Sequence, residues 1–208
     1  FHHVYKLSDG SVEADSRSMF ASEQAAFAFV LAAKRWPEGP WLKAAERALD
    51  AVTQLKYQRD FLSEFFYGAD HWSCLAAQRA WPLLKHKRYL DFCVGYSRFL
   101  QRLQYQEGRG EGDASFDGHY GFGYLSPPQA PATGGFGEGV MATLALAEAH
   151  GVKPHELSDI YDQARAGLEA LLRDQITPHN AWMIKDLEAS LGAFRRSLAE
   201  SEVRVDFV

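Results

Sequence analysis

Two kinds of hydrophobic pattern alternate along the chain. Three segments are apolar at nearly every position: residues 18–36, 70–84 and 137–150. Three others carry apolar side chains at helical spacing on one face only: residues 40–57, 88–107 and 154–174. A helix that is apolar all round is buried on every side, whereas a helix with one apolar stripe lies at the surface. The alternation therefore predicts an all-α fold in which helical hairpins form an inner and an outer layer, the arrangement of an α/α toroid.

The connections between these segments alternate as well. Links from an inner to an outer segment are short, such as residues 85–87. Gly151 is suited to end the third inner helix, because glycine readily adopts the left-handed backbone found there. Links from an outer to an inner segment are long, such as residues 58–69 and 108–136. This alternation predicts that the inner helices begin at one end of the domain, next to the long links.

Short extended segments are expected within the long links. Residues 4–5, 119–122 and 192–195 each precede the expected position of an inner helix, and residues 203–208 resemble them. We therefore expect a short strand in 203–208, leading to a fourth inner helix. With only three helix pairs in view, residues 1–208 are predicted to form a single α/α-toroid domain that is part of a longer domain continuing beyond Val208.

Composition narrows the functional classes. The 208 residues are 47% hydrophobic and 24% charged, with a net charge of -5 at pH 7, as in ordinary globular domains. Lysine and arginine are scattered and form no basic stripe, which argues against nucleic-acid binding. No apolar run has the length and purity of a membrane span, and no leader sequence is seen, so no membrane partner is expected and the compartment stays open.

Cysteine and motif content point to no metal or cofactor. Cys74 and Cys93 fall inside predicted helices, and the expectation is two buried thiols that pack as small apolar side chains; a disulfide is the alternative. The sequence lacks the spacing of a zinc site, a phosphate-binding loop and a nucleophile elbow. The glycine-rich residues 134–139 are interpreted as a turn into a helix.

The end at which the inner helices begin gathers acidic, imidazole and aromatic side chains. Helix N-termini favour carboxylates and anionic ligands. Paired carboxylates act as acid and base when their surroundings separate their pKa values, and aromatic rings offer flat surfaces for sugar rings. The candidate catalytic residues are Asp70, Glu138, Glu64 and Asp117. The candidate substrate-binding residues are His71, Trp72, Tyr67, His119, Tyr120 and Phe122.

Structural roles compete with these assignments. Asp70 is an ordinary N-cap residue, which satisfies free backbone N–H groups at a helix start. Asp117 and Gly118 form a favoured turn pair. An acidic residue such as Glu138 is expected in a first helical turn for electrostatic reasons alone.

The chain resembles the six-hairpin glycosidase superfamily. The resemblance is carried by two inner-helix segments, residues 68–77 and 135–142, and by the short links into Trp41-Leu42 and Tyr89-Leu90. This superfamily comprises α/α toroids of glycoside hydrolases, polysaccharide lyases and sugar epimerases. The resemblance covers most of the chain and is architectural. It implies the toroid fold and a site at the end described above, but transfers no role to any single residue.

Two kinds of function fit these features. The first is a carbohydrate-active enzyme, a glycoside hydrolase or a lyase or epimerase, that uses the carboxylates as acid and base. The alternative is a non-catalytic toroid that binds a glycan or a protein partner. An isoprenoid-processing toroid would need an Asp-x-Asp-Asp cluster, which the sequence lacks. The expected partners are a carbohydrate and, because exposed inner-helix surface favours association, the rest of the domain or a second copy.

Overall fold

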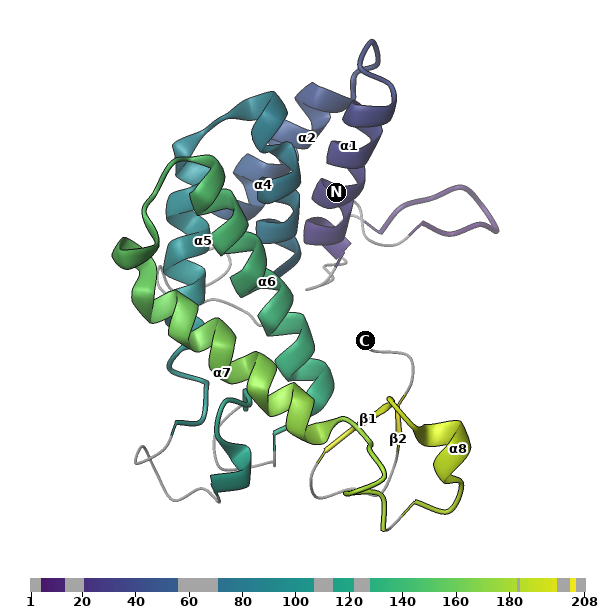
Figure 1. Cartoon of the computed structure of the whole chain (residues 1–208). Coiled ribbons are helices and arrows are strands. Elements are labelled where there is room, and N and C mark those ends of the chain that lie inside the picture. The colour runs from purple at the N-terminus through teal and green to yellow at the C-terminus, as the bar shows by residue number, and fades with distance from the viewer. Residues whose placement is uncertain are drawn as a thin grey trace.

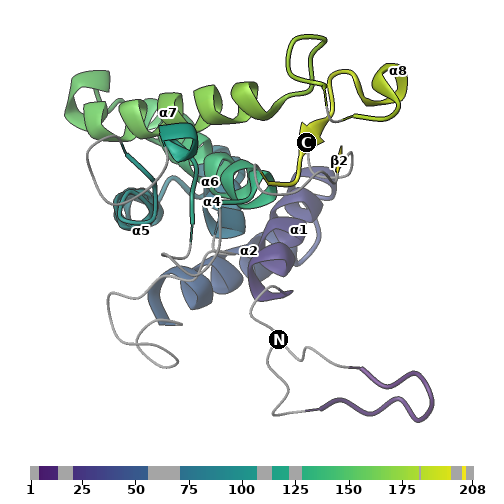
Figure 2. The ribbon, with the colours of Figure 1, turned by 90° about the horizontal axis from the view of Figure 1, so that it is seen from below.

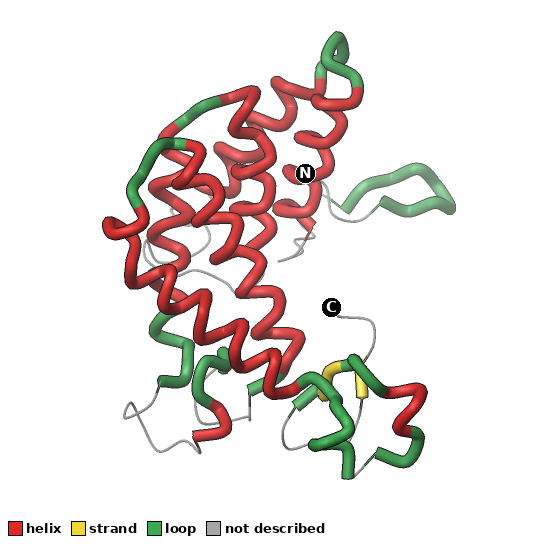
Figure 3. Tube along the Cα trace, viewed as in Figure 1, coloured by secondary structure: helices red, strands yellow, loops and turns green. Residues whose placement is uncertain are grey.

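The chain is mainly helical in the computed structural model, as the hydrophobic pattern predicted (Figures 1 and 3). The structure describes residues 5–13, 21–55, 71–106, 114–121, 128–182, 184–197 and 203–204. The main helices are α1 (Ala21–Arg35), α2 (Trp41–Asp50), α4 (His71–Leu84), α5 (Lys87–Leu100), α6 (Ala130–Ala149) and α7 (Ser158–Asp174). The shorter elements are η1 (Ala51–Leu55), η3 (Ala114–Phe116), η4 (Pro154–Leu157), α8 (Leu187–Ser190), β1 (Phe194–Arg195) and β2 (Val203–Arg204).

The helices pack in two groups. The three helices predicted as inner lie side by side in chain order, with α4 between α1 and α6 and in contact with both. The other three cover them: α2 packs on α1 and α4, α5 on α4 and α6, and α7 on α6 (Figures 1 and 2). The buried apolar side chains of all six helices form one continuous core.

Burial on every side, which the pattern predicted for the inner helices, is reached only in part. Leu31 on α1 and Met141 on α6 are each 46% exposed. The difference follows from position, because α4 has an inner neighbour on both sides whereas α1 has one only on the side of α4. Helix α4 buries five of its residues: Ser73, Cys74, Ala76, Ala77 and Ala80.

Short and long connections lie at opposite ends of the helices. The links after α1, α4 and α6 lie toward the upper part of Figure 1, and residues 101–106 and 114–121 of a long link lie at the lower end. All four of the expected extended segments contribute a residue to a bridge or strand: Tyr5 bridges Val12, Tyr120 bridges Gln104, and β1 pairs antiparallel with β2. The strand expected within residues 203–208 is β2.

Among the helix boundaries that differ from those expected, two bear on the site. Helix α5 ends at Leu100 instead of 107, because the backbone turns at 101–103 and Gln104 then pairs with Tyr120. Helix α6 begins at Ala130, seven residues earlier than expected, with a proline in its first turn, where the missing N–H costs nothing. The glycine-rich residues 134–139 are therefore helical and do not form a turn. Glu138 lies in the middle of α6, so the electrostatic argument for a first-turn acid does not apply to it.

Close packing explains why α6 keeps glycine at one of these positions. A Cβ atom at Gly139 would lie 2.9 Å from the Cβ of His71 and 3.1 Å from a ring carbon of Tyr96. A side chain there would push α4 and α5 away from α6. Gly139 thus lets α4 begin directly against α6, which determines where His71 is placed.

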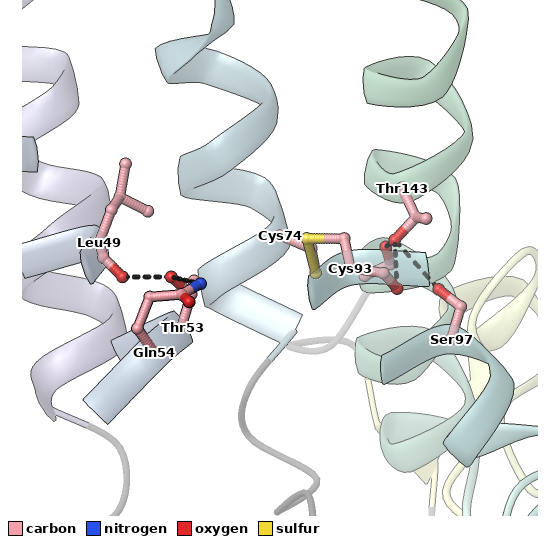
Figure 4. Close-up of a disulfide and its surroundings, with 8 residues drawn as sticks. Leu49, Thr53, Gln54, Cys74, Cys93, Ser97 and Thr143 are labelled. Atoms are coloured by element: carbon pink, nitrogen blue, oxygen red, sulfur yellow. Dashed lines mark hydrogen bonds between the residues drawn. A yellow bond between two sulfur atoms is a disulfide. The ribbon is translucent and has the colours of Figure 1, made fainter. Parts of the chain in front are cut away.

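The cysteines are paired, which corrects the expectation of two free thiols. A disulfide joins Cys74 on α4 to Cys93 on α5, with Cα atoms 5.6 Å apart and both residues fully buried (Figure 4). The hydroxyl of Thr143 on α6 donates to the backbone oxygen of Gly139, lies 3.3 Å from the backbone oxygen of Cys93, and accepts a hydrogen bond from Ser97. The disulfide therefore fixes α4 against α5, and the buried hydrogen-bond network fixes α5 against α6.

The end of α6 is capped as the sequence predicted. Gly151 has a φ of +79°, and its N–H donates to the oxygen of Glu148 while that of Val152 donates to Ala147, which is the Schellman pattern. The preceding His150 lies against Trp81 of α4, with ring centroids 3.8 Å apart. Burial lowers the pKa of His150 below its ordinary value, and the charge of Lys87 acts in the same direction.

The pH dependence of the free energy of unfolding should reflect the buried environment of His150. The pKa of His150 is lower in the folded than in the unfolded chain, so the unfolded state takes up the proton first. Its contribution to stability is present above about pH 6.5 and is lost as the pH falls through the folded-state value. Urea unfolding of the wild type and His150→Gln should therefore show a difference that shrinks between about pH 7.5 and pH 5. The same substitution at the exposed His155 is the control, and an equal slope for both would contradict the prediction.

Candidate functional site

Two predicted site residues, His71 and Glu138, lie close together where the start of α4 meets the middle of α6. Nε2 of His71 lies 3.8 Å from a carboxylate oxygen of Glu138. The His71 side chain is 15% exposed and that of Glu138 is 58% exposed. A carboxylate that is open to solvent and has an imidazole beside it can accept or deliver a proton to a bound molecule.

Glycines leave space around this pair. A Cβ atom at Gly135 would still be 3.7 Å from the His71 ring, and one at Gly137 would meet nothing within 4 Å. The backbone of α6 on either side of Phe136 therefore carries no side chain that would keep a ligand away. Glycine at such positions allows close approach of another molecule to the backbone.

An aromatic pair lies on the α1 side of the same region. The ring of Trp72 is 5.7 Å from that of Phe27 on α1 and 5.4 Å from the imidazole of His71, measured between centroids. Trp72 and Phe27 are both partly buried. The site thus combines an exposed carboxylate, an imidazole and an indole from α4 and α6, next to a ring from α1.

A second group of predicted residues lies on another side of α6. The imidazole of His119 has its Nδ1 3.0 Å from the hydroxyl of Thr133 and its Nε2 3.3 Å from a carboxylate oxygen of Asp174, the last residue of α7. The side chains of His119 and Asp174 are each 1% exposed. Among the described residues no group forms a hydrogen bond with the Asp174 carboxylate, and Nε2 of His119 lies close to it without meeting hydrogen-bond geometry. His119 and Asp174 thus lie buried between the start of α6 and the end of α7.

Hydrogen bonding fixes the ring of His119. Thr133 donates to the backbone oxygen of Gln129, one turn earlier on α6. A hydroxyl has one proton, so Thr133 accepts from Nδ1–H of His119 and from the backbone N–H of Tyr120. Nε2 of His119 then faces Asp174 without forming a hydrogen bond, so both ring nitrogens are turned into the core. His119 therefore offers nothing to a substrate at the surface, contrary to the substrate-binding role predicted for it.

Tyr120 is likewise a core residue, contrary to the substrate-binding role predicted for it. It is 1% exposed, and its ring meets that of Phe136 edge-on at a centroid distance of 5.3 Å. Burial raises the pKa of its phenol above the ordinary value. The bridge between Tyr120 and Gln104 at the end of α5 draws this segment inward.

Gly118 explains how residues 114–121 come to lie so close to α7. It has a φ of +87°, and a Cβ there would be 2.1 Å from the backbone oxygen of Ala166. Any larger residue would lift the segment off the helix. The neighbouring Asp117 is held by its backbone, since its carbonyl oxygen accepts from the guanidinium of Arg173. Asp117 therefore belongs to the group of His119, on another side of α6 from Glu138.

The remaining predicted site residues, Glu64, Tyr67, Asp70 and Phe122, lie outside the described residues. Of the predicted set, the structure thus groups His71, Trp72 and Glu138 in one place and Asp117, His119 and Tyr120 in another. The catalytic role of Glu138 stays a prediction.

Three polar residues that matter to this end of the domain were missed from the sequence. Glu23 in the first turn of α1 is fully buried. Asp174 and Thr133 hold His119. One signal was available for Asp174: an acid at a helix C-terminus opposes the helix dipole and implies a compensating partner.

Comparisons with protein-family models, curated proteins and solved structures found no match. Among the described residues, no three histidine, cysteine, aspartate or glutamate side chains are arranged to hold a metal ion. Within the same part of the chain, no helix has the length and apolar character needed to cross a membrane.

Proposed function

We propose that this chain is a carbohydrate-active protein built on part of an α/α toroid, with its site where α4 begins against α6. The observation that supports this function best is the grouping of an exposed Glu138 carboxylate, His71 and the Trp72–Phe27 rings beside glycine-lined backbone. The toroid is supported by the order of helix contacts: the inner helices α1, α4 and α6 are neighbours in chain order, and each outer helix packs on the inner ones.

In this proposal Glu138 carries out acid–base chemistry on a sugar. Its exposed carboxylate reaches a bound ligand, and His71 assists by offering or taking up a proton at Nε2. The second carboxylate that glycoside hydrolysis needs is assigned to Asp70, which directly precedes His71 in the sequence. In a glycosidase the two carboxyl groups stand about 5–10 Å apart, according to whether the enzyme retains or inverts configuration.

Carboxamide variants test the chemistry. On a substrate found by glycan screening, Glu138→Gln and Asp70→Asn should each reduce turnover by about 10²–10⁴-fold, because one acid–base group is lost. Both substitutions keep the size of the side chain, and asparagine caps a helix as well as aspartate, so the fold should be retained. Glu148→Gln, at an exposed position near the other end of α6, is the matched control. Full activity of both variants would leave these residues with structural roles.

A non-catalytic glycan-binding protein is the second candidate. The observation in its favour is that Asp117, His119 and Tyr120 lie on another side of α6, which leaves Glu138 as the acid placed beside the aromatic pair among the described residues. For a binding protein, screening would find a ligand but no turnover, and Trp72→Ala would weaken binding while Glu138→Gln would change it little.

A further inference from the structure

The outer face of α7 carries a row of exposed apolar side chains. Tyr161, Leu168 and Leu172 are 41%, 50% and 65% exposed, and the side chain of Arg165 between them is 69% exposed. We call these four residues the α7 seam. The opposite face of α7 is buried against the domain and comprises Ile160, Gln163, Ala164, Gly167, Ala170 and Asp174. Figure 2 shows α7 along one edge of the domain, with the other long helices on a single side of it.

The spacing of the seam is that of a helix-pairing surface. Its residues follow one another at intervals of four, three and four, which is the alternation found along the contact line of two-stranded coiled coils. Exposed apolar residues scattered singly need no explanation, but three in one line with this spacing form a surface that excludes water when a second helix covers it.

The seam is complementary to itself in the antiparallel direction. If a second copy of α7 packs about a two-fold axis passing between residues 166 and 167, Tyr161 faces Leu172 of the second copy and Arg165 faces Leu168 of the second copy. Each contact then occurs twice, as in an isologous dimer. We propose that the α7 seam is a homodimer interface and that its occupant is a second copy of this chain.

The charged side chains of α7 favour the antiparallel direction over the parallel one. In the antiparallel pair, the exposed Glu169 lies one position from the residue opposite Arg165, so two equivalent Arg165–Glu169 ion pairs form between the copies. The methylene stem of Arg165 covers Leu168 of the second copy while its guanidinium reaches the carboxylate. A parallel pair would instead place Arg165 against Arg165, and like charges across an interface are strongly unfavourable.

The interface is small, so the dimer is weak. The seam offers three apolar side chains to each partner, well short of the roughly 800 Å² per partner of a standard interface. We therefore expect a dissociation constant on the order of 10–100 µM, so that the protein is monomeric when dilute and dimeric when concentrated.

Charge reversal provides the test. Sedimentation velocity across a concentration series should show a monomer–dimer equilibrium for the wild type. Arg165→Glu and Glu169→Arg should each raise the dissociation constant about tenfold or more, because each places like charges opposite one another. The double variant should restore the wild-type constant, since it exchanges the two signs and rebuilds both pairs. Leu168→Glu should abolish the dimer.

These variants leave the monomer intact. Within one chain Arg165 pairs with Asp162, one turn earlier, with both side chains about 70% exposed, and such exposed pairs contribute little to stability. The helical circular dichroism signal should therefore be unchanged. Arg79→Glu, an exposed charge reversal on α4, is the control and should leave the equilibrium as in the wild type.

A wild type that stays monomeric at all concentrations would overturn the proposal. So would an assembly that survives Leu168→Glu, which would place its interface elsewhere, and so would failure of the double variant to restore association.

Discussion

Replacing His119 by leucine is expected to lower the free energy of unfolding by about 3–5 kcal/mol, because it leaves the buried Asp174 carboxylate without a partner. Both side chains are 1% exposed, and among the described residues no group forms a hydrogen bond with this carboxylate, so the 3.3 Å contact with His119 is what stands against its charge. Asp174 is also the last residue of α7, where the helix dipole disfavours negative charge. Urea denaturation followed by circular dichroism measures the loss.

A second substitution separates loss of the pair from loss of packing. Adding Asp174→Ala to His119→Leu removes the unpaired charge, so the double variant should be more stable than His119→Leu alone. The exposed His155→Leu is the control and should change stability by less than about 0.5 kcal/mol. A double variant that is less stable than His119→Leu would show that packing of these side chains matters more than their charge.

Breaking the Cys74–Cys93 disulfide should lower the free energy of unfolding by about 3 kcal/mol, because the bond closes a loop of some twenty residues and restricts the unfolded chain. Unfolding in urea with and without a dithiol reductant measures the effect on the wild type. A Cys74→Ala/Cys93→Ala variant should be indifferent to the reductant, which makes it the matched control. Equal midpoints for oxidised and reduced wild type would contradict the prediction.

Helix positions were predicted well where the hydrophobic pattern was long and uninterrupted. Helix α4 was expected over 70–84 and is described from His71 to Leu84. The prediction was accurate because burial of its tryptophan, leucine and alanine side chains favours a helix. The start of α6 was missed, because four glycines within residues 134–139 indicate a turn when only local preference is considered. Tertiary contact overrides that preference, since Gly139 fits against His71.

The candidate site was only partly accessible to sequence reasoning. His71 and Glu138 were chosen as residues of one end of the domain, but their contact depends on the closeness of α4 to α6, which no local pattern shows. His119 and Tyr120 were assigned to the site because they lie in the long link that leads into an inner helix. Gly118 instead lets that segment sink onto α7, and so both side chains are enclosed. The cysteine pairing depends on how α4 and α5 are rotated toward each other, which spacing alone does not fix.

The glycine-rich first half of α6 also has a consequence for the order of folding. Each glycine costs about 1 kcal/mol relative to alanine in an isolated helix, so residues 130–139 do not become helical unaided. We expect the second half of α6, with its alanines and leucines, to form and dock first. Glu138 should then reach its position late, when α4 packs against Gly139. Backbone amides near Glu138 should consequently exchange with solvent sooner than those near Leu146, and a ligand held at this site would slow that exchange.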